Sequence, residues 1–210
     1  MPGPSRREVL GNLVTLGFLS TATTLSATTL VEMFAEAEQR LLKPTPPNDL
    51  GPFYKANAPK IRDLRRASDR GLPLSVSGEV LSINGEPLPG ALVEVWHTDP
   101  RGQYDNTGFN YRAQMPAEAA GKYAFDTWMP GHYPDRVAQH IHYKISAPGH
   151  KTLVTQLYFA TDPAFQGDPD KNYNKDPLLE TRELIRPVLV YPESDSIRAA
   201  VNFQIVLEKG

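Results

Sequence analysis

The sequence contains no cysteine. This absence excludes disulfide bonds, thiolate zinc sites, iron–sulfur clusters and cysteine nucleophiles. The sequence also lacks an excess of either charge, because 22 lysines and arginines stand against 24 aspartates and glutamates, a net charge of −2. Proteins that bind nucleic acids usually have a basic excess. We therefore expect no nucleic-acid partner, and any metal site must be built from oxygen and nitrogen ligands.

Glycine-rich phosphate-binding loops, βαβ patterns and internal repeats are missing as well. Glycine and proline are nevertheless common, with 15 and 20 residues of 210. Proline ends helices and favours turns, so the chain is expected to turn often and to contain few long helices. The hydrophobic fraction of 40% is large enough for a packed core.

The first residues have the pattern of an export signal. Arg6 and Arg7 precede an uncharged, mildly hydrophobic stretch at 13–31, and Ala35-Glu36-Ala37 resembles a signal cleavage site. The paired arginines resemble those of a twin-arginine signal. We expect residues 1–37 to be a signal peptide recognised by the twin-arginine export machinery, which would make the mature protein periplasmic or secreted. A single membrane anchor is the alternative, which the many threonines disfavour.

The remaining chain divides into an N-terminal arm at 38–73 and a domain at 74–210. Short runs of alternating apolar and polar residues predict strands over 74–80, 91–97, 121–127, 140–145, 153–159 and 201–207. Turn signals such as Asn84-Gly85 and Pro89-Gly90 separate them. The pattern predicts an all-β fold, a β-sandwich of the prealbumin or immunoglobulin type with long loops and few short helices. The stretch 161–192 is expected to be a long loop with one helical turn near 181–186, and loops of that length are often functional.

A pair of histidines dominates the chemistry. His140 and His142 lie two residues apart in a predicted strand, so both imidazoles project from one face together with Lys144. Imidazole suits zinc, copper, iron and nickel, and the pair is therefore a candidate metal platform. Two neighbouring surface histidines are the alternative interpretation. A two-histidine, one-carboxylate site is a further possibility, although no Asp or Glu follows the pair before Asp162.

Two tyrosines near predicted turns extend the candidate site. Tyr133 lies in the turn Pro130-Gly131-His132-Tyr133-Pro134, and Tyr104 follows the strand that ends at His97. Tyrosine is an uncommon ligand because its pKa is near 10. A hard trivalent cation favours the phenolate, so two tyrosines with two histidines would indicate ferric iron rather than zinc.

In the order of these motifs, the sequence resembles the intradiol ring-cleavage dioxygenases, which open catechols with non-haem ferric iron. The resemblance covers about 51–207. Its pieces appear in family order: Gly78-Glu79-Val80, Pro89-Gly90-Ala91, Val93-Glu94-Val95-Trp96-His97, Gly102-Gln103-Tyr104, Gly121-Lys122-Tyr123, Pro130-Gly131-His132-Tyr133-Pro134, His140-Ile141-His142 and Thr155-Gln156-Leu157-Tyr158-Phe159.

The resemblance implies that Tyr104, Tyr133, His140 and His142 are the ligands of Fe(3+). It also implies a catechol-type substrate, O2 as the second substrate, and a cis,cis-muconate-type diacid as product. In this family the tyrosinate that matches Tyr133 is displaced by the substrate and takes one of its protons.

Two further residues are candidate catalytic groups by the same resemblance. Gln156 matches a position near the substrate ring. Arg136 lies four residues before His140, whereas the family commonly has its arginine three residues before. One residue reverses the face in a regular strand, so Arg136 must reach the site from a loop or a bulge, or else be a solvated turn residue.

The principal alternative function is a secreted, non-catalytic prealbumin-like β-sandwich that acts as a binding module. A third possibility is an iron site with altered chemistry, which the displaced arginine keeps open. His97, His132 and His150 are interpreted as turn or surface histidines, Asp99 as the cap of the turn that leads to Tyr104, and Tyr54 as a residue at the mouth of the site. The sequence leaves open which catechol is used and whether the protein is a homo-oligomer.

Overall fold

The computed structural model describes residues 41–133, 136–193 and 196–210. The predicted signal peptide at 1–37 lies outside these residues. None of the helices within them is long and apolar enough to cross a membrane. The compact unit spans Leu41–Gly210, so the predicted arm from residue 41 onward belongs to it.

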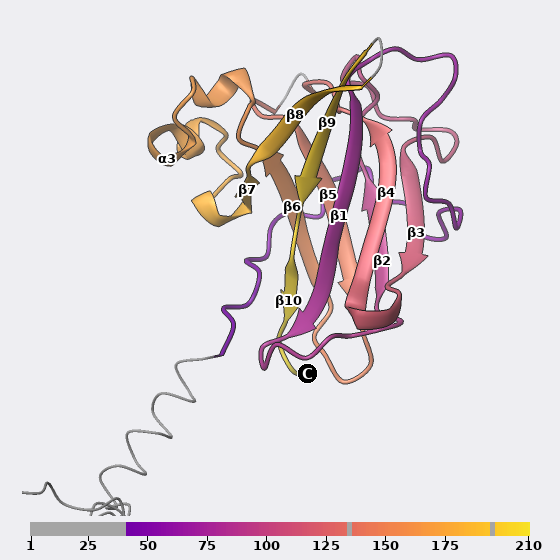
Figure 1. The fold of residues 1–210 in the computed structure, drawn as a ribbon, viewed down its shortest axis with the longest axis vertical. Helices are drawn as coiled ribbons and strands as arrows, with labels where there is room; N and C mark the ends of the chain where they lie inside the picture. Colours follow the sequence, from indigo (N-terminus) through magenta and orange to yellow (C-terminus); the bar gives the residue numbers. More distant parts are fainter. Residues whose placement is uncertain (1–40, 134–135, 194–195) are drawn as a thin grey trace, which may run out of the picture. The chain divides into compact units, whose positions relative to one another are not determined.

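The first of two mixed sheets is built around the strand β1 (Pro73–Ser82). An antiparallel partner, β4 (Lys122–Trp128), lies on one side of β1. Two parallel partners pair with successive parts of the other side, namely β9 (Ser196–Asn202) and β10 (Ile205–Leu207). The sheet is completed by β8 (Val188–Glu193), which pairs antiparallel with β9 (Figure 1).

The second sheet has the order β3-β2-β5-β6-β7. Its strands are β3 (Arg112–Pro116), β2 (Leu92–Trp96), β5 (His140–Ser146), β6 (Leu153–Phe159) and β7 (Ile185–Arg186). In its register, His142 lies opposite Trp96 on β2 and opposite Gln156 on β6. These three side chains therefore share one face.

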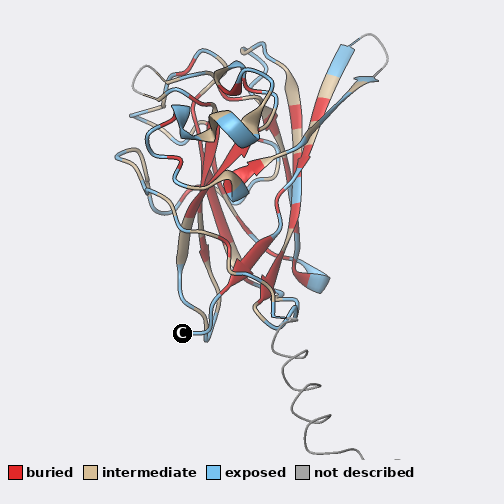
Figure 2. Cartoon of the chain, turned by 90° about the vertical axis from the view of Figure 1, so that its left-hand side faces the viewer, coloured by how far each residue is buried: buried red, intermediate tan, exposed pale blue. Residues whose placement is uncertain are grey.

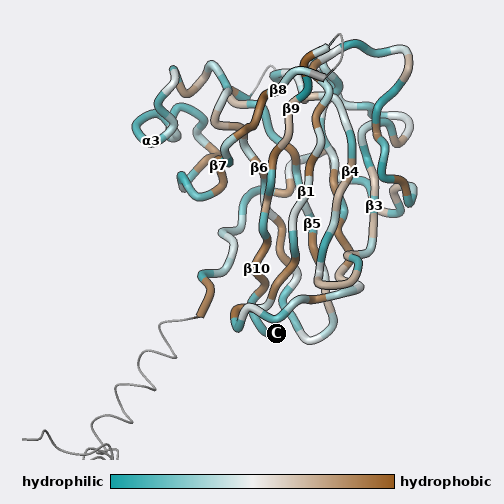
Figure 3. Tube along the Cα trace, in the orientation of Figure 1, coloured by the Kyte–Doolittle hydropathy of each residue, from teal (hydrophilic) through white to brown (hydrophobic). Residues whose placement is uncertain are grey.

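The core lies where the two sheets meet. The ring of Tyr143 on β5 packs against Tyr123 and Phe125 on β4, and against Phe203, with centroids 5.2 to 6.5 Å apart. Figure 2 shows the buried residues concentrated along the strands. Figure 3 shows the apolar residues in the same places and a largely hydrophilic segment around α3. The predicted all-β class is confirmed, and the finer assignment to a prealbumin or immunoglobulin sandwich stays a prediction.

Within the described residues the helices are short, as the proline content predicts. They are the 3-10 turns η1 (Ala119–Gly121), η2 (Pro163–Phe165), η3 (Tyr173–Lys175) and η4 (Arg182–Leu184), and the α-helix α3 (Pro169–Asn172). Four of these five lie in the segment 161–187, which we call the excursion. Buried Phe165, Leu179 and Leu184 anchor the excursion to the core.

The structure corrects two boundaries. A single strand is predicted over 201–207, but Phe203 breaks it: its N–H donates to Ser77 and its carbonyl accepts from the Tyr123 hydroxyl at 2.6 Å. The predicted loop 161–192 ends early, because its last residues form β7 and β8. The sequence patterns also gave no indication of β3.

The arm joins the two sheets at their edges. Backbone N–H groups of Leu42, Thr45 and Asn48 donate to the carbonyls of Ile83, Val206 and Val154 in turn. The arm thus runs from β10 of the first sheet to β6 of the second. From there it crosses the face of the second sheet that points away from the core, where it covers His142.

Candidate metal centre

The two histidines of β5 lie on the outer face of the second sheet. Ile141, Tyr143 and Ile145 point into the core, so His140 and His142 point the other way, with ring centroids 4.9 Å apart. The arm and the loops nevertheless cover them, leaving only 5% and 3% of the two residues exposed. The sequence-based placement of both imidazoles on one face is therefore what the structure shows.

Burial keeps both imidazoles neutral. It lowers the pKa of His140 to about 4 and that of His142 well below its usual range, and the positive charge of Arg136 acts in the same direction. His140 Nδ1 lies 2.8 Å from the carbonyl oxygen of Ala138. A carbonyl only accepts, so Nδ1 holds the proton and Nε2 keeps a lone pair for a metal. The ring of His142 stacks on Trp96 at 5.0 Å, which fixes its plane.

Asp99 organises the two turns that lead to the tyrosines. Its carboxylate accepts hydrogen bonds from the N–H groups of Arg101 and Gln103, as expected for a turn cap. Its carbonyl oxygen accepts from both Gly102 and Gly131, at 3.0 and 2.9 Å. One residue therefore holds the Tyr104 turn against the Tyr133 turn.

The two turns touch through their backbones at Gly102. This residue has a φ of +84°, and a Cβ atom there would lie 1.8 Å from the carbonyl oxygen of His132. Only glycine accepts both this backbone conformation and this approach. The close contact fixes the distance between Tyr104 and Tyr133 by main-chain packing.

Phe53 of the arm packs against both tyrosine rings. It stacks on Tyr104 at 4.1 Å and meets Tyr133 edge-on at 5.3 Å, while the two tyrosine rings are 5.8 Å apart. Buried Arg112 donates from Nη2 to the Phe53 carbonyl and from Nη1 to that of Asp105. The arm and the Tyr104 loop are thereby held together.

The hydroxyl of Tyr104 is buried and has no hydrogen-bond partner among the described residues. Burial raises the pKa of this hydroxyl well above its usual range, and the charges of Arg136 and Arg112 act in the opposite direction. An unpartnered buried hydroxyl costs stability and calls for an explanation. A cation bound at this oxygen would supply one, because its charge favours the phenolate.

Gln156 and Arg136 meet on the same face as the histidines. Arg136 Nη2 donates to Gln156 Oε1 at 3.2 Å and to the hydroxyl of Tyr158 at 2.5 Å. The Gln156 amide donates to the carbonyl of Asp49 at 2.7 Å. Arg136 reaches this place from the loop before β5 and is almost entirely buried, so it is not a solvated turn residue.

The donor set suits a hard trivalent ion. Two neutral imidazoles and two phenol groups lie close together, with the Tyr104 and His142 rings 6.4 Å apart. In the described part of the chain, no cluster of three or more His, Cys, Asp or Glu side chains is arranged to hold a metal. Asp162, the first carboxylate after the pair in sequence, accepts hydrogen bonds from the N–H groups of Gln139 and Ala164. The residues present fit ferric iron.

Of the other histidines, only His97 has different surroundings from those predicted. His97 is fully buried rather than in a turn or on the surface, with Nδ1 at 2.7 Å from the Thr98 carbonyl and Nε2 at 3.0 Å from the Thr127 hydroxyl. Both of its ring nitrogens are satisfied, so it is a core residue. His132 is about half exposed and lies 3.2 Å from Asp162, and His150 Nδ1 lies 2.9 Å from the Pro148 carbonyl oxygen.

Tyr54, predicted at the mouth of the site, lies beside the histidine face of the sheet. Its ring meets Trp96 edge-on at 5.1 Å. Its hydroxyl donates to Glu94 at 2.9 Å and accepts from Lys144 at 2.8 Å. This cluster ties the arm to the sheet next to the histidines. Neither Phe53 nor the fully buried Asp176 was predicted, because each acts through contacts far from its own place in the sequence.

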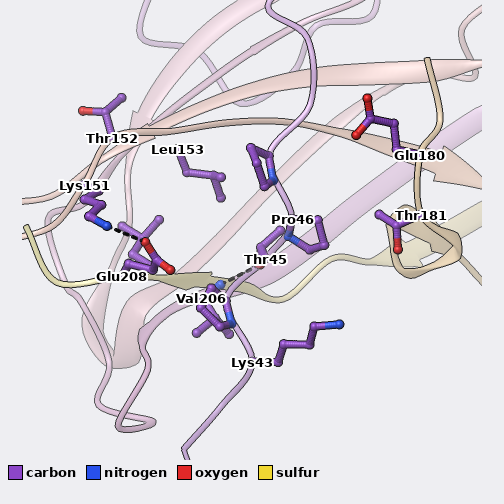
Figure 4. A pocket seen from close by; sticks show the side chains of 13 residues that line it. Lys43, Thr45, Pro46, Lys151, Thr152, Leu153, Glu180, Thr181, Val206 and Glu208 are labelled. Carbon is purple, nitrogen blue, oxygen red and sulfur yellow. Dashed lines mark hydrogen bonds and ion pairs between the residues drawn. The ribbon is translucent and has the colours of Figure 1, made fainter.

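A separate groove of about 600 Å³ lies between the arm, the start of β6 and β10 (Figure 4). Within it Thr45 is hydrogen-bonded to Val206, and Lys151 forms an ion pair with Glu208. None of the predicted site residues lines this groove.

Known proteins resemble this chain in sequence. Catechol 1,2-dioxygenase of Pseudomonas sp. (strain EST1001) is 34% identical over 155 residues, which are 61% of this chain and 51% of that protein. Hydroxyquinol 1,2-dioxygenase of Nocardioides simplex is 31% identical over 185 residues, 75% of this chain and 62% of that protein. A family model described as "Dioxygenase" matches residues 50–209. The chain belongs to the intradiol dioxygenase family.

Solved structures of the family agree with the fold. The dioxygenase domain of a dioxygenase carbohydrate-binding protein fusion from Streptomyces sp. SirexAA-E has a TM-score of 0.64 at 34% identity, over 80% of this chain and all of that one. Catechol 1,2-dioxygenase from Pseudomonas arvilla C-1 has a TM-score of 0.68 at 27% identity, over 86% of this chain and 67% of that one. The chain spans about half the length of the curated catechol 1,2-dioxygenases that it matches.

Proposed function

We propose that this intradiol dioxygenase opens the ring of a catechol-type diol with O2, giving a cis,cis-muconate-type diacid, and that it uses non-haem ferric iron. The observation that carries the proposal is the buried Tyr104 hydroxyl, which has no partner in the described part of the chain and lies beside two neutral imidazoles. The dioxygenases that resemble the chain support the same reaction.

Tyr104, Tyr133, His140 and His142 would hold the ion. Ferric iron bound there would act as a Lewis acid toward the two oxygens of the diol and make its ring reactive toward O2. Tyr133 then has a second role, because its phenolate oxygen can accept one of the protons that the diol releases. Tyr104 remains in place, because its ring stacks on that of Phe53 at 4.1 Å.

Arg136 and Gln156 would act on the substrate side. The Arg136 guanidinium is a nearby positive charge, and it lowers the pKa of Tyr104 against the effect of burial. Such a fixed cation stabilises anionic charge that develops during reaction. Gln156 holds the guanidinium and, through its amide, the carbonyl of Asp49. Phe53 and Trp96 supply apolar surface that would exclude water from the ring of the bound diol.

Oxygen uptake by the iron-loaded protein tests the proposal. The substrates are catechol, hydroxyquinol, protocatechuate and chlorinated catechols, and the ring-opened product is identified by mass spectrometry. The control is the protein with Tyr104→Phe and Tyr133→Phe together, which should lose both the tyrosinate-to-iron absorption and turnover. A non-catalytic binding module would be indifferent to these changes. A protein that takes up iron but consumes no oxygen with any of these diols contradicts the proposal.

We also propose that residues 1–37 direct export by the twin-arginine route. The support is the Arg6-Arg7 pair followed by an uncharged stretch. Replacing both arginines by lysine should retain the precursor in the cytoplasm. Unchanged export of that variant contradicts the route.

A further inference from the structure

We propose that Asp176, a buried carboxylate in the excursion, is a positioning residue that sets the direction of the Arg136 guanidinium. The inference rests on the proposed function, because its consequence is catalytic. It gives the excursion a role in the chemistry, although none of its residues belongs to the candidate metal ligands or to the predicted catalytic pair.

The carboxylate of Asp176 is completely buried and fully engaged. Both of its oxygens lie 3.2 Å from Arg136 Nε. One oxygen also accepts from the N–H of Ala138 at 3.1 Å, and the other from the N–H of Leu178 at 3.0 Å. Asp176 therefore connects the excursion to Arg136 and to the backbone two residues before His140.

The guanidinium of Arg136 is held at two of its corners. Nε faces Asp176, while Nη2 donates to Gln156 and to Tyr158. A guanidinium is planar and rigid, so fixing two corners also fixes the third. None of the described residues accepts a hydrogen bond from Nη1 of Arg136. We infer that Nη1 is the edge available to an anionic oxygen of the substrate.

This arrangement explains how the displaced arginine can serve the site. Arg136 lies outside β5, which begins at His140, so the register of the strand does not direct its side chain. A long side chain in a loop has many rotamers, and ordering it costs conformational entropy. The buried Asp176 selects one of them, and the Ala138 contact holds the loop backbone at the same time.

The excursion is itself fixed where Asp176 lies. The side chain of Asn48 in the arm donates to the Leu178 carbonyl at 2.8 Å. The neighbouring Leu179 is buried in the core, and its N–H donates to the carbonyl of Asp176. The backbone that carries Asp176 is thus fixed both by the arm and by the core. Leu179 also offers a matched control, because it anchors the same segment without touching Arg136.

The test compares Asp176→Asn with Leu179→Ala in the iron-loaded enzyme. The asparagine is nearly isosteric but can no longer accept from Arg136, Ala138 and Leu178 together. We expect its kcat/KM for the best diol to fall about 10- to 100-fold, mainly in kcat, as is typical when the partner of a site residue is removed. Leu179→Ala should lower thermal stability with a change in kcat/KM of less than about threefold. Equal losses in the two variants would overturn the proposal.

A double-mutant cycle shows whether Asp176 acts through Arg136. In an Arg136→Gln background, the further change of Asp176→Asn should reduce kcat/KM by less than about twofold. Independent, multiplicative losses overturn the proposal. If Asp176→Asn does not fold at the assay temperature, Asp176→Glu replaces it. That variant keeps the charge but displaces it by one methylene, and the same non-additivity is expected.

Hydrogen exchange of the metal-free protein separates this inference from the proposed function. Asp176→Asn should accelerate exchange of the backbone amides at 136–139, whereas Leu179→Ala should accelerate it mainly at 176–186. Exchange at 136–139 that matches the wild-type protein overturns the positioning role, whatever the activity. If the iron-loaded wild-type protein opens no diol, the proposed function fails, and the exchange result still decides the structural claim.

Discussion

Replacing Gly102 by alanine tests whether the contact between the two tyrosine-bearing turns builds the site. The new Cβ would lie 1.8 Å from the carbonyl oxygen of His132, so the turns must separate by more than about 1 Å. Alanine at a φ of +84° costs about 1 kcal/mol by itself. Overpacking typically adds about 1–3 kcal/mol. We expect a total loss of about 2–4 kcal/mol in the free energy of unfolding.

Gly90→Ala is the matched control. Gly90 has a φ of +80°, and a Cβ atom there would have no neighbour within 4 Å. This variant should therefore show only the conformational cost of about 1 kcal/mol, with unchanged activity. Urea unfolding of the metal-free proteins gives the two free energies, and oxygen uptake gives kcat/KM. Because a displacement of about 1 Å can reduce a rate about 100-fold, Gly102→Ala should lose that much. If the two variants behave alike, the turn contact does not position the tyrosines.

Three further outcomes are expected from the same assays. Tyr54→Phe removes the hydroxyl between Glu94 and Lys144, and should cost about 1–2 kcal/mol in urea unfolding; no loss would show that the cluster does not hold the arm. Tyr104→Phe should leave the stability of the metal-free protein unchanged or slightly higher, because the lost hydroxyl has no described partner, while the iron-loaded protein loses its tyrosinate absorption. The folded-state pKa of His140 is about 4 against 6.5 ordinarily, so the unfolded chain binds protons first as the pH falls. The unfolding free energy of the metal-free protein should thus decrease from pH 6.5 to about 4, and a flat profile would contradict this.

The sequence predicts those strands in which one face is apolar and the other face is polar. In β5 the apolar residues Ile141, Tyr143 and Ile145 alternate with the histidines, and in β6 the predicted bounds agree with the structure. The alternating pattern does not identify β3. Its Arg112 is a charged residue on the outer face, but it is buried beneath the arm. The pattern also fails for β8, which reads as part of a proline-rich loop until its pairing with β9 is known.

Local patterns draw attention to the candidate ligands, and the family resemblance completes the set. Histidines at alternate positions share a face of a strand, and turn residues surround both tyrosines. The residues that support them are not marked in this way. Asp176 lies 40 positions from Arg136 and Phe53 lies in the arm, so no local pattern indicates either contact. The face that Arg136 reaches also depends on the path of a loop, which a strand register does not set.

The two faces of β5 have different roles. One face fills the core with Ile141, Tyr143 and Ile145, and the stability of the sheet depends on it. The other face holds histidines that burial keeps neutral and lies near a buried phenol that has no described partner, and this unpartnered phenol disfavours the folded state without a metal. The arm and the excursion cover that face through a small number of polar contacts, such as those of Gln156 with Asp49 and of Arg136 with Asp176. Changes in these covering segments should therefore alter the reaction more than the fold, whereas changes on the core face should do the reverse.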